Sequence, residues 1–394
     1  MILPGSTIGI LGGGQLGRMF AIAARRMGYQ IHCLDPVSYG PTGQIADVEV
    51  NAAYDDRDAA TLFAQNVDVV TFEFENVPAA TLSAIEAIKP VRPSPFVLET
   101  TRHRLREKGF LTLNGFPTAP HHAVRSAADL REAIAVIGTP CILKTAEFGY
   151  DGKGQVKITD TGQTDAAWAQ LNAPVGALEG FVRFDREVSV IVARTSRGEI
   201  KCFDVFANDH RKHVLDVTTI VRREDLRTPR DGHPWASSRL LDRAVDLATQ
   251  IADKLKLVGL MCVEMFAIGD DLIVNELAPR PHNSGHVTVD ACVTSQFEQQ
   301  LRAVCGLPLG DPRCLRPAAM ANLLGDLWAH GPPNWAAALR DPRVKLHLYG
   351  KTDAKPGRKM GHLTALADTT EEARHLVLAA RGALVPSTFA AIEH

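Results

Sequence analysis

The sequence predicts a protein of mixed α/β and α+β class, with a parallel sheet near its start and antiparallel strands further along. Over about the first hundred residues, strand-like and helix-like segments alternate, which is the βαβ pattern of a parallel sheet covered by helices. After Cys141, glycine-containing turns such as 196–198 join successive strands, as in antiparallel hairpins. A chain of 394 residues, 45% of them hydrophobic, is long and apolar enough for roughly two to three domains.

The N-terminal elements follow from the spacing of apolar residues. In chain order they are strands over 7–11, 30–35 and 67–72 and helices over 15–27, 59–65 and 79–88. The first helix is expected to stop at Gly28. Pro90, Pro93 and Pro95 then mark the end of this part of the chain, because proline interrupts helices and strands.

The later elements are predicted in the same way. A polar helix over 102–114 is closed by Gly115 and Pro117. It is followed by strands over 141–145, 156–159, 187–194 and 200–207, a helix over 240–255, and a hairpin whose arms are 262–268 and 271–276. The proline-rich tail from Pro332 onward is expected to be less regular.

The composition indicates which binding partners and which cellular compartment to expect. Lys and Arg number 43 against 45 Asp and Glu, so the chain has no broad basic surface and nucleic acid is not an expected partner. The seven cysteines are scattered and never spaced C-x-x-C, which argues against a disulfide framework or a cysteine zinc site. No apolar run is long enough to span a bilayer, and the start lacks signal-peptide features. We therefore expect a cytoplasmic protein.

A glycine-rich turn follows the first predicted strand. Gly12, Gly14 and Gly17 fit the pattern G-x-G-x-x-G at the start of a helix, and Asp35 ends the next strand about 20 residues on. Such a turn lets a backbone approach an anion at a helix N-terminus. This feature alone leaves two interpretations open, a nicotinamide-dependent oxidoreductase or a tight strand-to-helix turn with no ligand.

A second glycine-rich segment, GYDGKGQ at 149–155, follows Lys144 at the end of a strand. Three glycines in so short a segment suit a flap whose N–H groups fold over phosphates, with Lys144 and Lys153 adding charge. The structural alternative is a glycine-rich hairpin turn with solvated lysines.

Two glutamates are expected to face each other in the late hairpin. If its turn is centred on Asp270, Glu264 and Glu276 lie opposite each other on one face of the sheet. Opposed carboxylates repel, and a divalent cation removes that penalty, because Mg²⁺ prefers one or two carboxylates together with phosphate oxygens. Strict alternation would point Asn275 to the other face. The alternatives are a solvated face or a register one residue different.

These residues resemble the ATP-grasp ligases, and specifically the 5-(carboxyamino)imidazole ribonucleotide synthetase family. The strings that carry the resemblance are GGGQLGRM at 12–19, TFEFENV at 71–77, GYDGKGQ at 149–155, NELAPRPHNSGH at 275–286 and PGRKMGH at 356–362. The resemblance implies an ATP-grasp fold in three parts. These are an N-terminal Rossmann-like parallel-sheet domain at 1–100, a small lid domain with the flap at 101–186, and a C-terminal antiparallel-sheet domain with the Mg-ATP site at 187–394.

The resemblance also implies a reaction. An ADP-forming carbon–nitrogen ligase of this family carboxylates 5-aminoimidazole ribonucleotide with bicarbonate and ATP, through carboxyphosphate, in de novo purine biosynthesis. The implied cofactors are ATP and Mg²⁺, with Mn²⁺ as an alternative metal. A homodimer is implied as well, and direct transfer of the product to a downstream mutase is left open.

Site residues are carried over by their place in the matching strings. The nucleotide would contact Arg104, Lys144, Gly149, Tyr150, Gly152, Gly154, Gln155, Glu179, Val182, Glu187, His210 and Asn275. Within that set, Glu179 and Val182 would hold the adenine and Glu187 the ribose. The metal ligands would be Glu264 and Glu276. The catalytic groups would be Asp151, Lys153, Arg280 and His282. The ribonucleotide side would include Gln15, Leu16, Glu73, Asn283, Ser284, Lys351, Arg358 and Lys359.

The chain departs from the family pattern at four positions. His103 stands where an Asp is usual, Phe148 and His213 where a Gly is usual, and Lys355 where an Arg is often present. These changes bear on flap motion and on the shape near His210. The competing functions are another ATP-grasp ligase acting on a ribonucleotide, a nicotinamide-dependent dehydrogenase, and a nucleotide-binding scaffold without turnover.

Overall fold

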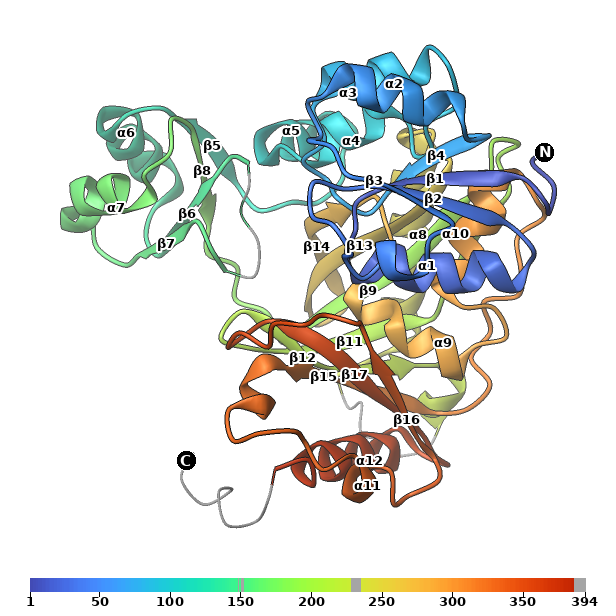
Figure 1. Ribbon diagram of the computed structural model, residues 1–394. Helices are drawn as coiled ribbons and strands as arrows, with labels where there is room; N and C mark the ends of the chain where they lie inside the picture. The colour runs from blue at the N-terminus through green and yellow to red at the C-terminus, as the bar shows by residue number, and fades with distance from the viewer. Residues whose placement is uncertain (148, 150–151, 228–234, 386–394) are drawn as a thin grey trace.

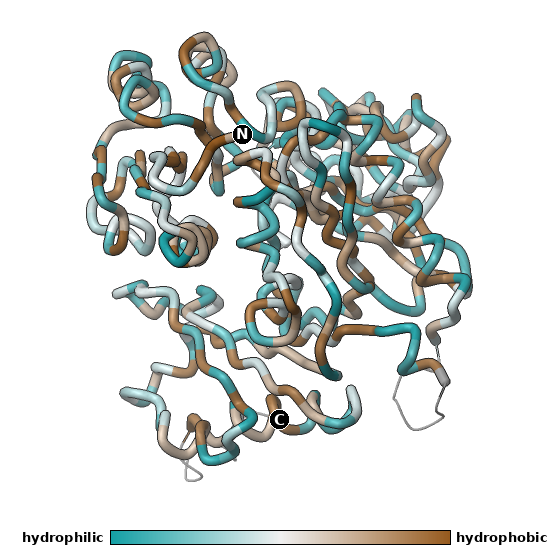
Figure 2. Tube along the Cα trace, turned by 90° about the vertical axis from the view of Figure 1, so that its right-hand side faces the viewer, coloured by the Kyte–Doolittle hydropathy of each residue, from teal (hydrophilic) through white to brown (hydrophobic). Residues whose placement is uncertain are grey.

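The computed structural model describes residues 1–147, 149, 152–227 and 235–385, which form three sheets with helices packed against them (Figure 1). One sheet is parallel and two are antiparallel, so the predicted mixture of α/β and α+β structure is confirmed. All seven cysteines are free, as expected. In Figure 2, hydrophobic and hydrophilic residues alternate along most helices and strands. Within the described residues, no helix is long and apolar enough to cross a membrane.

The N-terminal sheet has the strand order β3-β2-β1-β4. Its strands are β1 (Thr7–Leu11), β2 (Gln30–Leu34), β3 (Val48–Val50) and β4 (Val69–Phe72). Its helices are α1 (Gln15–Arg26), α2 (Arg57–Gln65), α3 (Ala79–Glu86) and α4 (Pro95–Thr101). The alternation along β1 explains why both faces are covered, because Ile8 and Ile10 pack under α1 whereas Leu11 packs under α2 and α3. Figure 1 shows α2 and α3 on one side of the sheet and α1 on the other.

The sequence analysis missed two elements of this sheet. Strand β3 has only three residues, too few for a periodic pattern. Helix α4 begins at Pro95, one of the prolines that were expected to interrupt structure. Proline is well tolerated in the first turn of a helix, where its missing N–H costs nothing.

A small antiparallel sheet with the order β5-β8-β6-β7 projects from the rest of the molecule (Figure 1). Helix α5 (Arg104–Leu113) precedes it in the chain. Its elements are β5 (His121–Val124), α6 (Ala127–Ile137), β6 (Cys141–Thr145), β7 (Gln155–Ile158), α7 (Thr164–Leu171) and β8 (Gly176–Gly180). The flap lies in the connection between β6 and β7.

The third sheet has nine antiparallel strands in the order β14-β13-β9-β11-β12-β15-β17-β16, with β10 also paired to β9. The strands are β9 (Arg186–Arg194), β10 (Ile200–Cys202), β11 (Val205–Arg211), β12 (Val214–Val221), β13 (Gly259–Ile268), β14 (Asp271–Ala278), β15 (Ala318–Leu324), β16 (Val344–Leu348) and β17 (Lys359–Leu366). The helices are α8 (Ser238–Lys254), α9 (Thr288–Ala291), α10 (Gln296–Cys305), α11 (Trp335–Ala338) and α12 (Thr370–Gly382). Helix α10 packs beside α1 and so joins this sheet to the N-terminal one.

Two predictions for this region are wrong. The strand expected over 200–207 is divided into β10 and β11, because the register against β9 shifts by one residue between them. The described part of the tail after Pro332, up to residue 385, is regular, since β16, β17 and α12 enclose a core that includes Leu363, Ala365 and Val377.

The β13–β14 hairpin contains a bulge that positions the site. Next to the turn, Ile268 pairs with Asp271 and Met265 with Val274, but Glu264 pairs with Glu276. Asn275 is therefore an extra residue on β14, and a bulge of this kind redirects the side chains around it. The predicted pairing of Glu264 with Glu276 is confirmed, although the register predicted near the turn is one residue off.

Candidate active site

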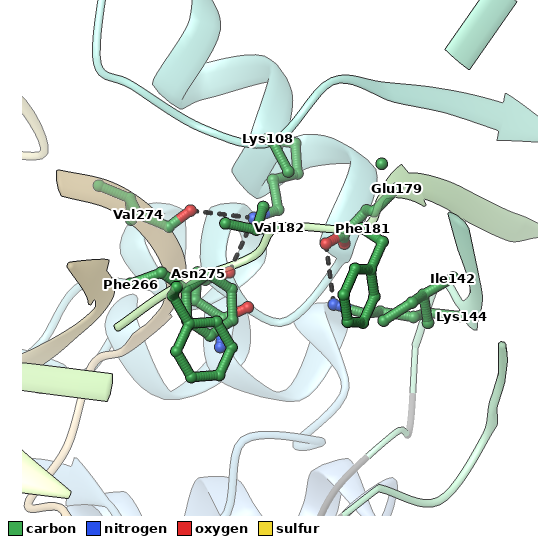
Figure 3. Close-up of a pocket in the computed structure, with 12 residues that line it drawn as sticks. Lys108, Ile142, Lys144, Glu179, Phe181, Val182, Phe266, Val274 and Asn275 are labelled. Carbon is green, nitrogen blue, oxygen red and sulfur yellow. Dashed lines mark hydrogen bonds and ion pairs between the residues drawn. The ribbon is translucent and has the colours of Figure 1, made fainter. Parts of the chain in front are cut away.

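A pocket lies where the small sheet approaches the β13–β14 hairpin (Figure 3). Its walls are largely apolar, and Phe184 and Phe266 stack with ring centroids 4.5 Å apart. The full lining is Lys108, Ala119, Ile142, Lys144, Glu179, Gly180, Phe181, Val182, Phe184, Phe266, Val274 and Asn275. An apolar slot with a few convergent polar groups is the usual form of a site for a flat organic ring.

Four residues predicted to contact the nucleotide meet in this pocket. Lys144 comes from β6, Glu179 from β8, Val182 from the segment that follows β8, and Asn275 from β14 (Figure 3). Strict alternation along the strand predicted that Asn275 would point away from Glu264 and Glu276. That expectation is wrong, because the bulge changes the alternation at this residue.

Buried charges are concentrated at one side of the pocket. The Nζ of Lys144 lies 2.8 Å from Glu179 Oε2, and a guanidinium nitrogen of Arg104 lies 4.0 Å from Glu179 Oε1. Burial raises the pKa of Glu179, but Lys144, Lys108 and Arg104 outweigh it and lower that pKa to about 2. This carboxylate stays ionised and holds the two cations beside the pocket, where they are placed to meet phosphates.

The two glutamates expected to bind a metal lie opposite each other, each beside a cation. Glu264 Oε1 is 3.0 Å from His282 Nε2, and Glu276 Oε2 is 3.9 Å from Arg104. Burial raises the pKa of Glu276; Arg104 opposes the effect, while the carboxylates of Glu264 and Glu75 add to it. The side chain of Glu276 is 41% exposed, so a ligand can reach it.

The donor set at these glutamates fits Mg²⁺. Among the described residues, no group of three or more His, Cys, Asp or Glu side chains is placed to hold a metal ion. Two carboxylates that face each other supply what Mg²⁺ takes from a protein when nucleotide phosphates complete its shell.

The loop after β14 carries His282 and its support. The Nδ1 of His282 lies 2.9 Å from the hydroxyl of Ser284, which in turn lies 2.9 Å from the hydroxyl of Ser189 on β9. Ser284 is fully buried. Its hydroxyl contacts the His282 ring and so helps to orient it, and the substrate contact that the resemblance implied for Ser284 stays a prediction.

Asn283 is placed differently from its neighbour Ser284. It is 7% exposed, and within the described residues neither its Nδ2 nor its Oδ1 has a hydrogen-bond partner. A buried amide without partners is costly, so a ligand that pairs with it gains affinity. Arg280, the other predicted group of this loop, lies 2.8 Å from Glu75.

The glycine turn before α1 is occupied by the protein's own carboxylate. Glu73 accepts hydrogen bonds from the backbone N–H of Gly14, of Leu16 at 3.0 Å and of Gly17 at 3.1 Å. A Cβ atom on Gly14 would lie 2.4 Å from Glu73, so the glycine is required for this approach. A dinucleotide could reach this helix N-terminus only by displacing Glu73.

Asp35, the residue expected to hold a dinucleotide ribose, is also engaged. Its Oδ2 accepts from the N–H of Gly13 at 2.6 Å and from the hydroxyl of Tyr54 at 2.6 Å. The interpretation as an oxidoreductase therefore loses both of its anchoring groups, and Gln15 and Leu16 begin a helix whose N-terminus holds Glu73.

The flap is described only in part, because Phe148, Tyr150 and Asp151 lie outside the described residues. Gly149 lies near Arg104, since a Cβ atom there would be 3.7 Å from its guanidinium. Gly152 and Gly154 have positive φ angles, which glycine adopts without strain, and Lys153 between them is exposed.

The far end of the flap contacts the β11–β12 turn. Gln155 lies 3.4 Å from His213 Nδ1, and a Cβ atom on Gly152 would lie 2.5 Å from His213. His213 adopts a φ of 65°, and Lys212 one of 49°. The departure at His213 thus places a side chain in the left-handed region, directly against the flap.

The ribose end of the predicted site is formed by β9 and β11. Glu187 and His210 form an ion pair, and Glu187 pairs across the sheet with Phe266, which lines the pocket. Burial lowers the pKa of His210, but the hydrogen bond to Glu187 outweighs it and the pKa is raised.

The basic loop between β16 and β17 lies against the N-terminal sheet region. The Nζ of Lys351 donates to the carbonyl of Lys359 at 2.7 Å, and Arg358 donates to the carbonyl of Asp353 at 2.8 Å. Gln44 donates to the carbonyl of Gly350 at 2.7 Å, which fixes the loop beside α1. The predicted phosphate clamp therefore lies on the same side of the molecule as the glycine turn.

Among the charged residues that line the pocket, Lys108 was not predicted. Lys108 is fully buried and lies in the lining beside Asn275. The signal was present in the sequence, because Lys108 follows Arg104 by four residues and so shares its face of helix α5.

The chain is similar to known proteins over most of its length. A ribonucleotide synthetase preATP-grasp domain matches residues 5–102, an ATP-grasp domain matches 109–297, and a phosphoribosylaminoimidazole carboxylase C-terminal domain matches 318–376. The N5-carboxyaminoimidazole ribonucleotide synthase of Bacillus subtilis (strain 168) is 42% identical over 377 residues, covering 94% of each chain. The enzyme of that name from Brucella melitensis is 42% identical, covering 93% of this chain and 98% of its own.

Solved structures give the same result. The ADP complex of an N5-carboxyaminoimidazole ribonucleotide synthetase has a TM-score of 0.88 and 42% identity, covering 96% of this chain and 97% of its own. The Aspergillus clavatus enzyme in complex with ADP and 5-aminoimidazole ribonucleotide has a TM-score of 0.86 and 29% identity, covering 96% and 98%. The ATP-grasp fold expected from the sequence is thereby confirmed.

Proposed function

The chain belongs to the N5-carboxyaminoimidazole ribonucleotide synthase family of ATP-grasp ligases, and from this membership we propose how its residues perform the family's reaction. The reaction is the ATP-dependent carboxylation of 5-aminoimidazole ribonucleotide in purine biosynthesis. The observation that carries the assignment of residues is the pocket of Figure 3, an apolar slot lined by the cations Lys108 and Lys144 and by Asn275. Asn275 adjoins Glu276, which pairs with Glu264 on the neighbouring strand.

ATP binds with its adenine in the apolar slot. Glu179 and Val182 lie at the edge of the slot, and Glu187 lies one strand away, where a carboxylate accepts hydrogen bonds from ribose hydroxyls. Lys144 and Arg104 face the phosphates, and the N–H groups of the flap from Gly149 to Gln155 close over them.

Glu264 and Glu276 hold Mg²⁺, for which Mn²⁺ can substitute. The ion supplies positive charge to the phosphates during transfer of the γ-phosphoryl group. The support for this assignment is the pairing of the two carboxylates and the raised pKa of Glu276, which burial and the facing carboxylates cause.

Bicarbonate is activated in the loop that holds Arg280, His282 and Asn283. A bicarbonate oxygen attacks the γ-phosphorus and ADP leaves, which produces carboxyphosphate. The guanidinium of Arg280 and the ring of His282 bind its negative charge, and the unpartnered amide of Asn283 pairs with it or with the aminoimidazole. Cleavage of the C–O bond releases phosphate and CO₂, and the exocyclic amine then forms the C–N bond and loses a proton.

The ribonucleotide lies between the glycine turn and the basic loop. Lys351, Arg358 and Lys359 hold its phosphate, and it contacts Gln15 and Leu16 at the start of α1 and Glu73 after β4, whose carboxylate is itself bonded to that helix start. The contact between Gln44 and the loop supports this arrangement, because it fixes the two groups on one side of the molecule. Asp151 and Lys153 complete the site from the flap.

The experiment that tests the function is ADP release by the purified protein with Mg-ATP, adding bicarbonate and 5-aminoimidazole ribonucleotide separately and together. ADP formation that requires the ribonucleotide and rises with bicarbonate is expected. Mg-ATP binding without stimulation by the ribonucleotide would instead indicate another ATP-grasp substrate or a scaffold without turnover. Light scattering on the same sample tests the homodimer that the family suggests.

A further inference from the structure

Strand β14 is the last strand of its sheet, so one of its edges has no neighbouring strand. At the bulge, the carbonyls of Val274 and Asn275 both accept hydrogen bonds from Lys108 Nζ, at 3.3 Å and 2.7 Å (Figure 3). Successive carbonyls of a regular strand point to opposite sides. The carbonyls of Val274 and Asn275 can both face the Lys108 ammonium only because the bulge interrupts this alternation.

Helix α5 and the segment after it supply the partners that a neighbouring strand would provide. Glu107 accepts from the N–H of Leu277 at 2.6 Å, and the carbonyl of Pro117 accepts from the N–H of Val274 at 2.8 Å. Glu107 is 1% exposed and Lys108 is fully buried. Burying these two polar side chains is costly unless they are hydrogen-bonded, and both direct their hydrogen bonds to one short stretch of β14.

The bulge decides which side chain faces Glu264. From the turn outward the register pairs Met265 with Val274, and without an extra residue Glu264 would pair with Asn275. The bulge moves Asn275 aside, toward the pocket, and brings Glu276 opposite Glu264. A pair of carboxylates, rather than a carboxylate and an amide, is therefore created by this single irregularity.

We propose that Lys108 is a positioning residue that holds the Asn275 bulge and thereby keeps Glu276 opposite Glu264 for metal binding. Two neighbouring carbonyl dipoles that point the same way repel each other, and the ammonium between them removes this repulsion. The inference rests on the proposed role of Glu264 and Glu276 as Mg²⁺ ligands, and it gives Lys108 a task distinct from nucleotide contact.

The competing role is a direct contact with the nucleotide, since Lys108 also lines the pocket. The two roles differ in one measurable property. A direct contact contributes equally to ADP affinity with and without metal, whereas a residue that holds the bulge contributes mainly to the gain in affinity that Mg²⁺ provides and, through Asn275, less to the metal-free affinity.

The test is the dissociation constant of ADP, measured by calorimetry with and without Mg²⁺, for the wild type, Lys108→Met and Lys108→Gln. Lys108→Met keeps the length and burial of the side chain but removes its donors. We expect the Mg²⁺-dependent gain in ADP affinity to fall roughly tenfold or more, which corresponds to about 1.4 kcal/mol, with a clearly smaller loss of the metal-free affinity.

Lys108→Gln provides the rescue, because its amide has two N–H groups for the two carbonyls. It should retain the gain to within about threefold, and it remains informative if Lys108→Met does not fold. Lys254→Met, on the exposed side of α8, is the matched control and should leave both constants unchanged.

Three results overturn the inference. They are a normal Mg²⁺ gain in Lys108→Met, an equal loss with and without Mg²⁺, and a loss in Lys108→Gln as large as in Lys108→Met. A wild type whose ADP affinity does not respond to Mg²⁺ would instead refute the metal site itself, and this outcome is distinguishable because it appears before any substitution is made.

Discussion

Glu264 and Glu276 face each other across the β13–β14 hairpin, and each is balanced by a cation from a different part of the chain. His282 lies 3.0 Å from Glu264, and Arg104 lies 3.9 Å from Glu276. The His282 ring helps to lower the pKa of Glu264 to about 2 against the opposing effect of burial. Glu264 is therefore kept ionised, and Glu276 remains accessible to a metal that arrives with a nucleotide.

Replacing Glu276 by Gln should separate metal binding from folding. ADP release at saturating Mg²⁺ should fall roughly 100-fold or more, because the charge that a metal contributes to phosphoryl transfer is worth several kcal/mol. The Tm without metal should not fall, since the amide no longer repels Glu264. Steady-state kinetics and thermal unfolding of the same preparation give both values, and near-normal turnover would remove Glu276 from the metal site.

Replacing Arg358 by Ala should weaken ribonucleotide binding. A charge-assisted hydrogen bond to a phosphate is worth roughly 1.5–3 kcal/mol, so the KM for 5-aminoimidazole ribonucleotide should rise by about tenfold or more. The KM for ATP should stay unchanged, because Arg358 lies on the basic loop rather than at the nucleotide pocket. Arg340→Ala, at an exposed position after α11, is the control. An unchanged KM for the ribonucleotide would argue against the phosphate clamp.

The pairing of Glu179 with Lys144 predicts a pH-dependent contribution to stability. The pKa of Glu179 is lowered from its usual value of 4.5 to about 2 in the folded protein, because three cations outweigh burial. A lowered folded-state pKa contributes stability that is present above about pH 4.5 and is lost as the pH falls toward 2.

Glu179→Gln should therefore be less stable than wild type by roughly 3 kcal/mol at neutral pH, because Lys144 is left buried and uncompensated. The difference should narrow as the pH falls below about 4.5, where the wild-type carboxylate begins to be protonated. Urea unfolding at several pH values measures this, with the exposed Glu86→Gln as control. A difference that does not change with pH would contradict the assignment.

The sequence predicted well the features that depend on local pattern. The strand over 141–145 coincides with β6 at both ends, because its apolar residues and flanking turn are all local. The pairing of Glu264 with Glu276 was also predicted, but from a register that is one residue off at the turn, and the Asn275 bulge restores the pairing.

Features that depend on distant side chains could not be predicted. The Asn275 bulge is held by Lys108, which lies 167 residues away in the chain, and no local pattern reports such a contact. The glycine turn matched a dinucleotide motif because Glu73, which fills it, lies 59 residues from Gly14. In both places the contact that could not be predicted is made by a charged residue, Lys108 or Glu73, inside the fold. Arguments from composition or periodicity assign such residues to the surface.

The start of helix α5 gives a prediction about stability. His103 occupies the N-cap position, and within the described residues its side chain accepts no hydrogen bond from the first turn of the helix. Burial, followed by the charge of Arg106, lowers the pKa of His103, so its ring is neutral near pH 7 and does not complement the helix dipole. The family usually has Asp at this position, and Asp is among the best N-cap residues.

His103→Asp should therefore stabilise the protein by about 0.5–2 kcal/mol, because its carboxylate can accept from backbone N–H groups in the first turn of α5 and lies near Arg102 and Arg106. Urea unfolding compares the variant with wild type, and His103→Ala, which cannot cap, should show no gain. The stabilisation should shrink as the pH falls below about 4, where Asp becomes protonated. Equal stability of the Asp and Ala variants at pH 7 would contradict this prediction. It would show that the hydrogen bonds from Glu107 and Lys108 of α5 to β14 hold the helix and that a cap adds no stability.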